Sequence, residues 1–106
     1  MNEQKILRQF AENLRMEFAV KDISVYRNMK KIYGKNIDNV DLDKYLSLSC
    51  STVFKTDSSS VLVTRFVSEK GSCIFVIYSD NAAAFDGQEA EYIISDIKKI
   101  KGKIGD

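Results

Sequence analysis

Apolar residues recur every three or four positions over residues 2–20, a spacing that predicts a helix with one buried stripe. The stripe consists of Ile6, Leu7, Phe10, Leu14 and Phe18. Polar residues fill most of the other positions, so the opposite side of this helix is expected to face water. Asn2 is a candidate N-cap, although Lys5 stands where a capping box requires Glu or Gln.

A second helical stripe lies near the end of the sequence and predicts a helix within residues 82–104. Its members are Ile93, Ile97, Ile100 and Ile104. Two starting points remain open for this helix. Asp80 or Asn81 can cap an early start, whereas Asp86-Gly87-Gln88-Glu89 has the form of a capping box and favours a later one.

Two β-branched and aromatic runs, Val61–Val67 and Cys73–Tyr78, predict an antiparallel hairpin. The connection between them contains Gly71, which supplies the positive φ that closes a hairpin loop of this length. Both runs are apolar on both faces. Strands of this kind are covered on both sides, so we expect cover from the chain itself or from a partner.

The segment after the first helix fits two structures. Ile23–Met29 alternates with period two at its start and contains β-branched residues, which favours a strand. The apolar positions also fit one face of a helix, and that alternative stays open. Further along, we expect a loop at Asn36–Asp43, one turn of helix at Asp41–Leu48 and a short strand at Cys50–Phe54.

Together these elements predict one α+β domain over residues 1–106. It consists of a helix, an antiparallel sheet of three to four strands, and a C-terminal helix packed on one sheet face. A chain of 106 residues suits a single domain.

The amino-acid composition limits which catalytic and metal sites the chain can form. The chain has no histidine, which excludes Ser–His and Cys–His dyads and every zinc site that contains histidine. Cys50 and Cys73 are too few for a four-thiolate site, and we expect both to be small buried hydrophobes. Sixteen basic and fifteen acidic residues give a formal charge of +1, without a strongly basic arm or an acidic tail.

The apolar runs bear on location. They are far shorter than the ~20 residues that cross a bilayer, and Met1–Lys21 lacks the uninterrupted apolar run of a signal peptide. We therefore expect a cytoplasmic protein without membrane insertion.

No motif predicts catalysis. Asp38, Asp41 and Asp43 lack the glycine turn and terminal glutamate of a calcium loop, so a solvated loop is expected there. Ser58–Ser60 has neither a nucleophile elbow nor a histidine to activate it. We expect a non-enzymatic protein with no metal and no cofactor.

One segment interleaves basic and aromatic residues, with no acidic residue between Asp22 and Asp38. Its members are Tyr26, Arg27, Lys30, Lys31, Tyr33 and Lys35. Such a pattern can hold phosphates by charge and stack bases on rings, whereas the alternative is a solvated strand edge whose lysines deter pairing. The lysines within residues 98–103 suit the C-terminal end of a helix dipole.

Two stretches carry a resemblance to a known family. The first is the stripe Phe10, Leu14 and Phe18 followed by Ser24-Val25-Tyr26 and Lys30-Lys31, and the second is the hairpin Val61–Tyr78 followed by Phe85, Tyr92, Ile93, Ile97 and Ile100. In this order they resemble the fourteen-kilodalton subunit of the signal recognition particle Alu domain.

The resemblance implies a helix–three-strand–helix fold within a ribonucleoprotein. It also implies a dimer with a similar small subunit, whose sheet would extend this one, and RNA held on the sheet surface. The residues implied to contact phosphates are Arg27, Lys30, Lys31, Arg65 and Lys70, with Tyr26 as a stacking surface.

The alternative is a protein-binding module, such as an inhibitor, an immunity protein or a secretion chaperone. Its apolar sheet face would form a dimer or seat a partner helix, and the acids at positions 38, 41 and 43 would be interface charges. RNA that co-purifies would favour the first interpretation, and an RNA-free homodimer the second.

Overall fold

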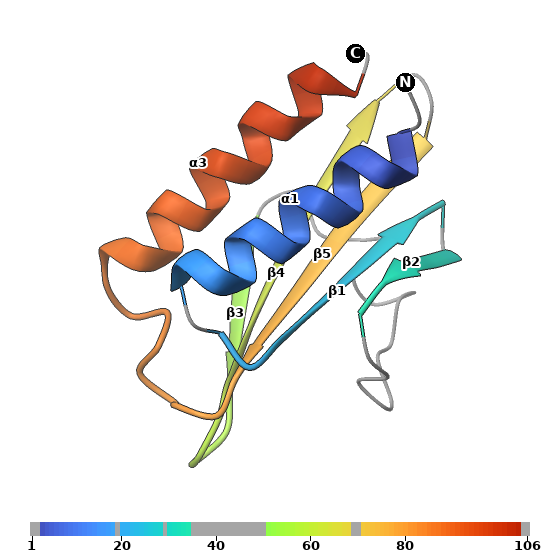
Figure 1. Cartoon of the computed structure of the whole chain (residues 1–106). Helices are drawn as coiled ribbons and strands as arrows, with labels where there is room; N and C mark the ends of the chain where they lie inside the picture. Colours follow the sequence, from blue (N-terminus) through green and yellow to red (C-terminus); the bar gives the residue numbers. More distant parts are fainter. Residues whose placement is uncertain (1–2, 19, 29, 35–50, 69–70, 105–106) are drawn as a thin grey trace.

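The computed structural model describes residues 3–18, 20–28, 30–34, 51–68 and 71–104, which form two helices and five strands (Figure 1). In chain order these are α1 (Glu3–Phe18), β1 (Asp22–Arg27), β2 (Lys30–Tyr33), β3 (Thr52–Lys55), β4 (Ser60–Ser68), β5 (Gly71–Ser79) and α3 (Gln88–Lys103). The strands form one antiparallel sheet in the order β2-β1-β5-β4-β3. Both helices lie on the same face of it (Figure 1).

The predicted α+β class is confirmed, but the sheet has five strands rather than three to four. The additional strand is β2, whose four residues begin with two lysines and are too short and too polar to predict a strand. Asn28, with φ of 53°, turns the chain from β1 into β2, because asparagine tolerates the left-handed region better than most residues.

A bulge in β2 determines which of its side chains face the helices. Val25 pairs with Tyr33 and Tyr26 pairs with Lys31, so Ile32 is an extra residue in the ladder. Ile32 and Tyr33 both pack in the core beneath α1, whereas the Lys31 ammonium lies over the Tyr26 ring. The bulge therefore directs a lysine away from the helices and two apolar side chains toward them.

The sheet face that carries the helices holds the larger core, which we call the first cluster. Its buried members include Leu7, Ala11 and Leu14 of α1, Ile23 and Val25 of β1, Leu62 of β4, Cys73, Phe75 and Ile77 of β5, and Ile93, Ile97 and Ile100 of α3. Phe75 is fully buried, with the Phe10 ring edge-on to it at a centroid distance of 5.7 Å. The predicted stripe of α3 is thus buried, whereas in the stripe of α1 Leu7 and Leu14 are buried and the other members are partly buried.

The opposite face of the sheet carries a smaller cluster, which we call the second cluster. It consists of Tyr26, Val63, Ile74 and Val76, with Phe54 and Val61 packed against it. Its four members are already buried within the single chain. The strands are therefore apolar on both faces, as their sequences predict.

Several local predictions can be compared with the structure. The strand interpretation of residues 23–29 is confirmed for residues 23–27 by β1, whereas Asn28 turns the chain and Met29 lies outside the described residues. Gly71 has the positive φ expected at the hairpin, 122°. The later start of the last helix is also confirmed, but its N-cap is Gly87 rather than Asp86. Asn81 instead accepts a hydrogen bond from the Ala83 backbone N–H at 3.0 Å, within the preceding turn.

Cys73 is a free and buried thiol, as predicted. Other predictions lie outside the described residues: the Asn2 cap, the loop at Asn36–Asp43, the helical turn at Asp41–Leu48 and the burial of Cys50.

Candidate functional site

Three of the residues predicted to contact RNA belong to one row across the sheet. Lys31 of β2 pairs with Tyr26 of β1, Tyr26 pairs with Ile74 of β5, and Ile74 pairs with Arg65 of β4. Paired residues point to the same face, and neighbouring strands are ~4.8 Å apart, so the row places Lys31 and Arg65 on the second-cluster face about 14 Å apart. The Lys31 Nζ lies 6.0 Å from the centroid of the Tyr26 ring.

The other predicted contacts are placed differently. Tyr26 is only 7% exposed, so its ring packs in the second cluster rather than standing open for base stacking. Arg27 is 8% exposed and forms an ion pair with Glu3 of α1, which puts its guanidinium on the helix-bearing side of the sheet. Lys30 is exposed beside Arg27 on the β2 edge, and Lys70 lies outside the described residues.

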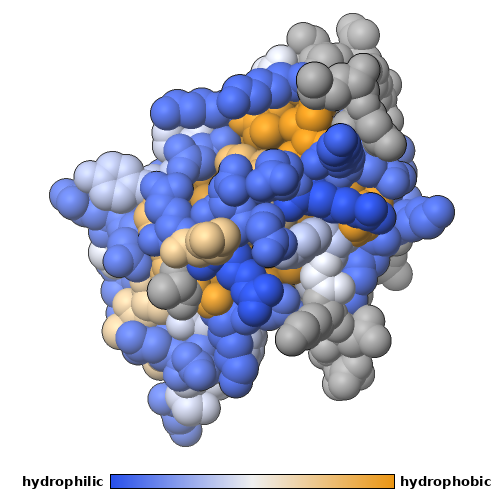
Figure 2. Space-filling view, viewed as in Figure 1, coloured by the Kyte–Doolittle hydropathy of each residue, from blue (hydrophilic) through white to orange (hydrophobic). Residues whose placement is uncertain are grey.

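An open groove lies between α1 and α3, with a volume of 370 Å³. Its lining residues are Lys5, Ile6, Gln9, Phe10 and Asn13 of α1 with Ile100 and Lys103 of α3. Figure 2 shows hydrophobic surface between the two helices, on a face that is otherwise mostly hydrophilic. The groove is therefore an apolar strip that the two helices leave accessible.

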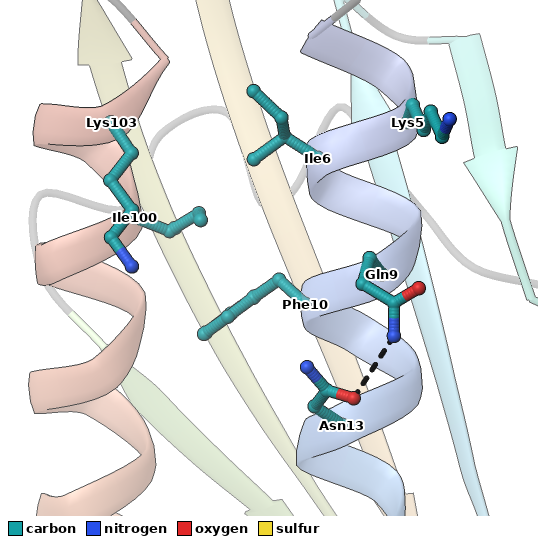
Figure 3. Close-up of a pocket in the computed structure, with 7 residues that line it drawn as sticks. All are labelled: Lys5, Ile6, Gln9, Phe10, Asn13, Ile100 and Lys103. Atoms are coloured by element: carbon teal, nitrogen blue, oxygen red, sulfur yellow. Dashed lines mark hydrogen bonds between the residues drawn. The ribbon is translucent and has the colours of Figure 1, made fainter.

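The side chains of the groove form an apolar floor with a polar rim (Figure 3). Ile6 and Phe10 point from α1 toward α3, and Ile100 points from α3 toward α1. On the rim, the Gln9 amide donates a hydrogen bond to Asn13 Oδ1 at 3.1 Å, and Lys103 supplies a positive charge on the α3 side. Such a surface can accept apolar side chains of a partner.

A second concavity, with a volume of 330 Å³, lies where β4 meets α3. The described residues that line it are Ser51, Thr64, Arg65, Phe66, Ile97, Lys98 and Lys101. None of them lines the groove between the helices, so the two surfaces are distinct.

Two titratable groups in the described part of the chain have shifted pKa values. Burial raises the pKa of the Cys73 thiol to about 12. The hydrogen bond that Tyr33 donates to Glu12 raises the pKa of the Tyr33 phenol. Both groups are therefore protonated at neutral pH, and neither acts as a nucleophile or a base there.

Two further searches cover only the described part of the chain. It contains no group of three cysteine, aspartate or glutamate side chains that could hold a metal ion. None of its helices combines the length and the apolar composition that a membrane span requires.

The two concave surfaces were not predicted from the sequence. The only signals for them were Ile6 and Ile100 within the helical stripes, and the spacing of Lys98 and Lys101 on one helix. In comparisons with known proteins, the chain matches no protein-family model and no curated protein.

Proposed function

We propose that this protein is a non-enzymatic binding module that accepts an apolar segment of a protein partner in the groove between α1 and α3. The observation that supports the proposal is the groove itself. Ile6 and Phe10 remain partly exposed there, facing Ile100 across an open space between two helices. Grooves of this form seat amphipathic segments whose apolar residues recur at helical spacing.

The energetics require several anchor residues from the partner. A side chain of leucine size contributes about 1.5–3 kcal/mol when it is fully buried, whereas a micromolar complex needs about 8 kcal/mol. Three or more anchors are thus needed, and an acidic group near Lys103 would add charge complementarity. We expect a partner segment of at least two helical turns.

The burial of both sheet clusters favours the groove over a sheet face as the docking surface. Phe75 at the centre of the first cluster and Val63 and Ile74 in the second have no exposed surface. A partner would have to displace packed residues to reach either cluster.

The test is affinity purification of the native protein in two matched forms. Ile6→Gln places a polar group on the groove floor, and Met16→Gln changes an exposed α1 residue outside the groove. We expect Ile6→Gln to lose a protein that wild type and Met16→Gln both retain. Circular dichroism confirms that each variant is folded, and equal recovery by all three forms would contradict the proposal.

RNA binding is a second candidate function, as a dimeric cytoplasmic subunit of a ribonucleoprotein resembling the signal recognition particle Alu domain. The observation that favours it is the row that carries Lys31 and Arg65 on one face. Lys30 adds an exposed cation at the β2 edge. A similar subunit would extend the sheet at β3, because the bulge and the lysines of β2 deter pairing at that edge.

A salt titration of RNA binding tests this second function. Each phosphate contact contributes about 0.7–0.9 to the slope of log affinity against log salt. Lys30→Gln combined with Lys31→Gln should therefore reduce the slope by about 1.4–1.8. Lys5→Gln combined with Lys99→Gln is the control, and an equal effect of both pairs would argue against RNA contact at the two β2 lysines.

A further inference from the structure

The concavity between β4 and α3 exists because β3 is short. β3 begins at Thr52, which pairs with Val63. From Thr64 onward β4 is therefore paired with β5 on one side, and no described strand lies on its other side. The space beneath α3 at this position is filled by neither β3 nor a large apolar side chain of the described residues. It forms the pocket of 330 Å³, which falls in the range of small-molecule sites.

Positive charge is concentrated on this pocket. Two of its seven described lining residues are lysines of α3, Lys98 and Lys101. Arg65 borders the pocket from β4, but it pairs with Ile74, so its side chain points to the second-cluster face, away from α3. Lys98 and Lys101 are three positions apart and so share one side of the helix. Lys99, between them in sequence, is exposed and does not line the pocket.

Two hydroxyl groups add polar contacts. Ser51 Oγ and Thr64 Oγ1 are 3.0 Å apart and share one hydrogen bond, so one hydroxyl hydrogen remains for another acceptor. Thr64 is buried and Ser51 is half-buried, which places this pair on the inner side of the pocket.

The remaining wall is apolar. Phe66 is half-buried, with its ring centroid 6.4 Å from that of Phe75, and Ile97 comes from the buried stripe of α3. One wall of the pocket therefore suits a flat apolar group, while the other side suits an anion.

We propose that this pocket binds a small organic phosphate whose ring lies against Phe66. The phosphate contacts Lys98 and Lys101. A phosphate monoester carries nearly two negative charges and three terminal oxygens, which match several cations and hydroxyls better than a single carboxylate does. This site goes beyond the proposed partner groove, because the two surfaces share no residue.

The experiment is a titration of ¹⁵N-labelled protein at constant ionic strength, followed by amide chemical shifts. Adenosine monophosphate and phenyl phosphate are the probes. Adenosine, which lacks the phosphate, and inorganic phosphate, which lacks the ring, are the controls. We expect both probes to shift amides around Thr64–Phe66 and Ile97–Lys101 and to bind more tightly than either half.

Charge variants assign the contact. Lys98→Gln and Lys101→Gln should each weaken probe binding about tenfold, in the range of a lost hydrogen bond to a charged group. Lys99→Gln should leave it unchanged. The proposal is overturned if neither probe shifts these amides, if adenosine or inorganic phosphate binds as tightly as the probes, or if Lys99→Gln weakens binding as much as Lys98→Gln.

Discussion

Arg27 at the end of β1 forms an ion pair with Glu3 in the first turn of α1, with Arg27 Nε and Glu3 Oε1 2.5 Å apart. Arg27 Nη1 also donates a hydrogen bond to the Gly71 carbonyl oxygen at 3.3 Å. One side chain thus links α1, β1 and the start of β5. The sequence pattern predicts that Arg27 contacts a phosphate, but in the fold its guanidinium is engaged by Glu3 and the Gly71 carbonyl.

Replacing Arg27 tests this structural role. Arg27→Ala leaves the partly buried Glu3 carboxylate without its partner, which should lower the free energy of unfolding by about 2–3 kcal/mol, below the cost of breaking a fully buried pair. Urea unfolding of Arg27→Ala, Glu3→Gln and the double variant measures the coupling, expected at about 1–2 kcal/mol. Additive effects would mean that the two side chains do not interact in solution.

The Cys73 thiol should resist modification in the folded protein. With its pKa raised to about 12 by burial, about one thiol in 10⁴ is ionised at pH 8. The Cys50→Ser variant isolates Cys73, and we expect an aromatic disulfide reagent to react with it slowly in buffer and rapidly in urea. Rapid stoichiometric reaction without denaturant would contradict the burial of Cys73.

The hydrogen bond from Tyr33 to Glu12 predicts a pH dependence at alkaline pH. Because the pKa of Tyr33 is raised in the folded state, its stabilising contribution is fully present below the unfolded pKa near 10 and is lost as pH rises through the folded pKa. Tyr33→Phe should cost about 0.5 kcal/mol at pH 7, since the bond is exposed. Unfolding at several pH values should show this difference vanish above pH 10, and a constant difference would contradict it.

Two glycine substitutions should have opposite effects. Gly34 has φ of 108°, and an added Cβ would lie 2.3 Å from the Ile23 carbonyl oxygen, so Gly34→Ala should destabilise by about 2 kcal/mol or more. Gly102 lies in α3 with open space around it, so Gly102→Ala should stabilise by about 0.5 kcal/mol. Thermal unfolding compares them, and a shift of the same sign for both would contradict this placement.

Periodic patterns predicted the main elements because each pattern is local. The helical stripes and the hairpin 61–78 depend on spacing within one segment, and the structure confirms them. Strand β2 was not predicted because it depends on the turn at Asn28 and on a bulge at Ile32. A short polar segment gives no sequence signal for either feature.

The candidate surfaces depend on contacts between distant segments. The sequence marked Arg27 as a basic residue but could not show that Glu3 lies against it. Likewise, Lys98 and Lys101 line one pocket with Thr64 and Phe66 only because α3 packs against β4 beyond the end of β3. The sequence therefore shows which residues carry charge, whereas which of them lie together in space depends on the register of the sheet.

Site-specific photo-crosslinking tests the proposed partner groove most directly. A benzophenone side chain at Gln9, on the groove rim, is compared with one at Met16, which is 78% exposed on the same helix outside the groove. We expect Gln9 to crosslink one protein at a defined segment that carries apolar residues at helical spacing, and Met16 to yield no such product. Equal crosslinking from both positions, or none from Gln9 in cells, would contradict a docking role for the groove.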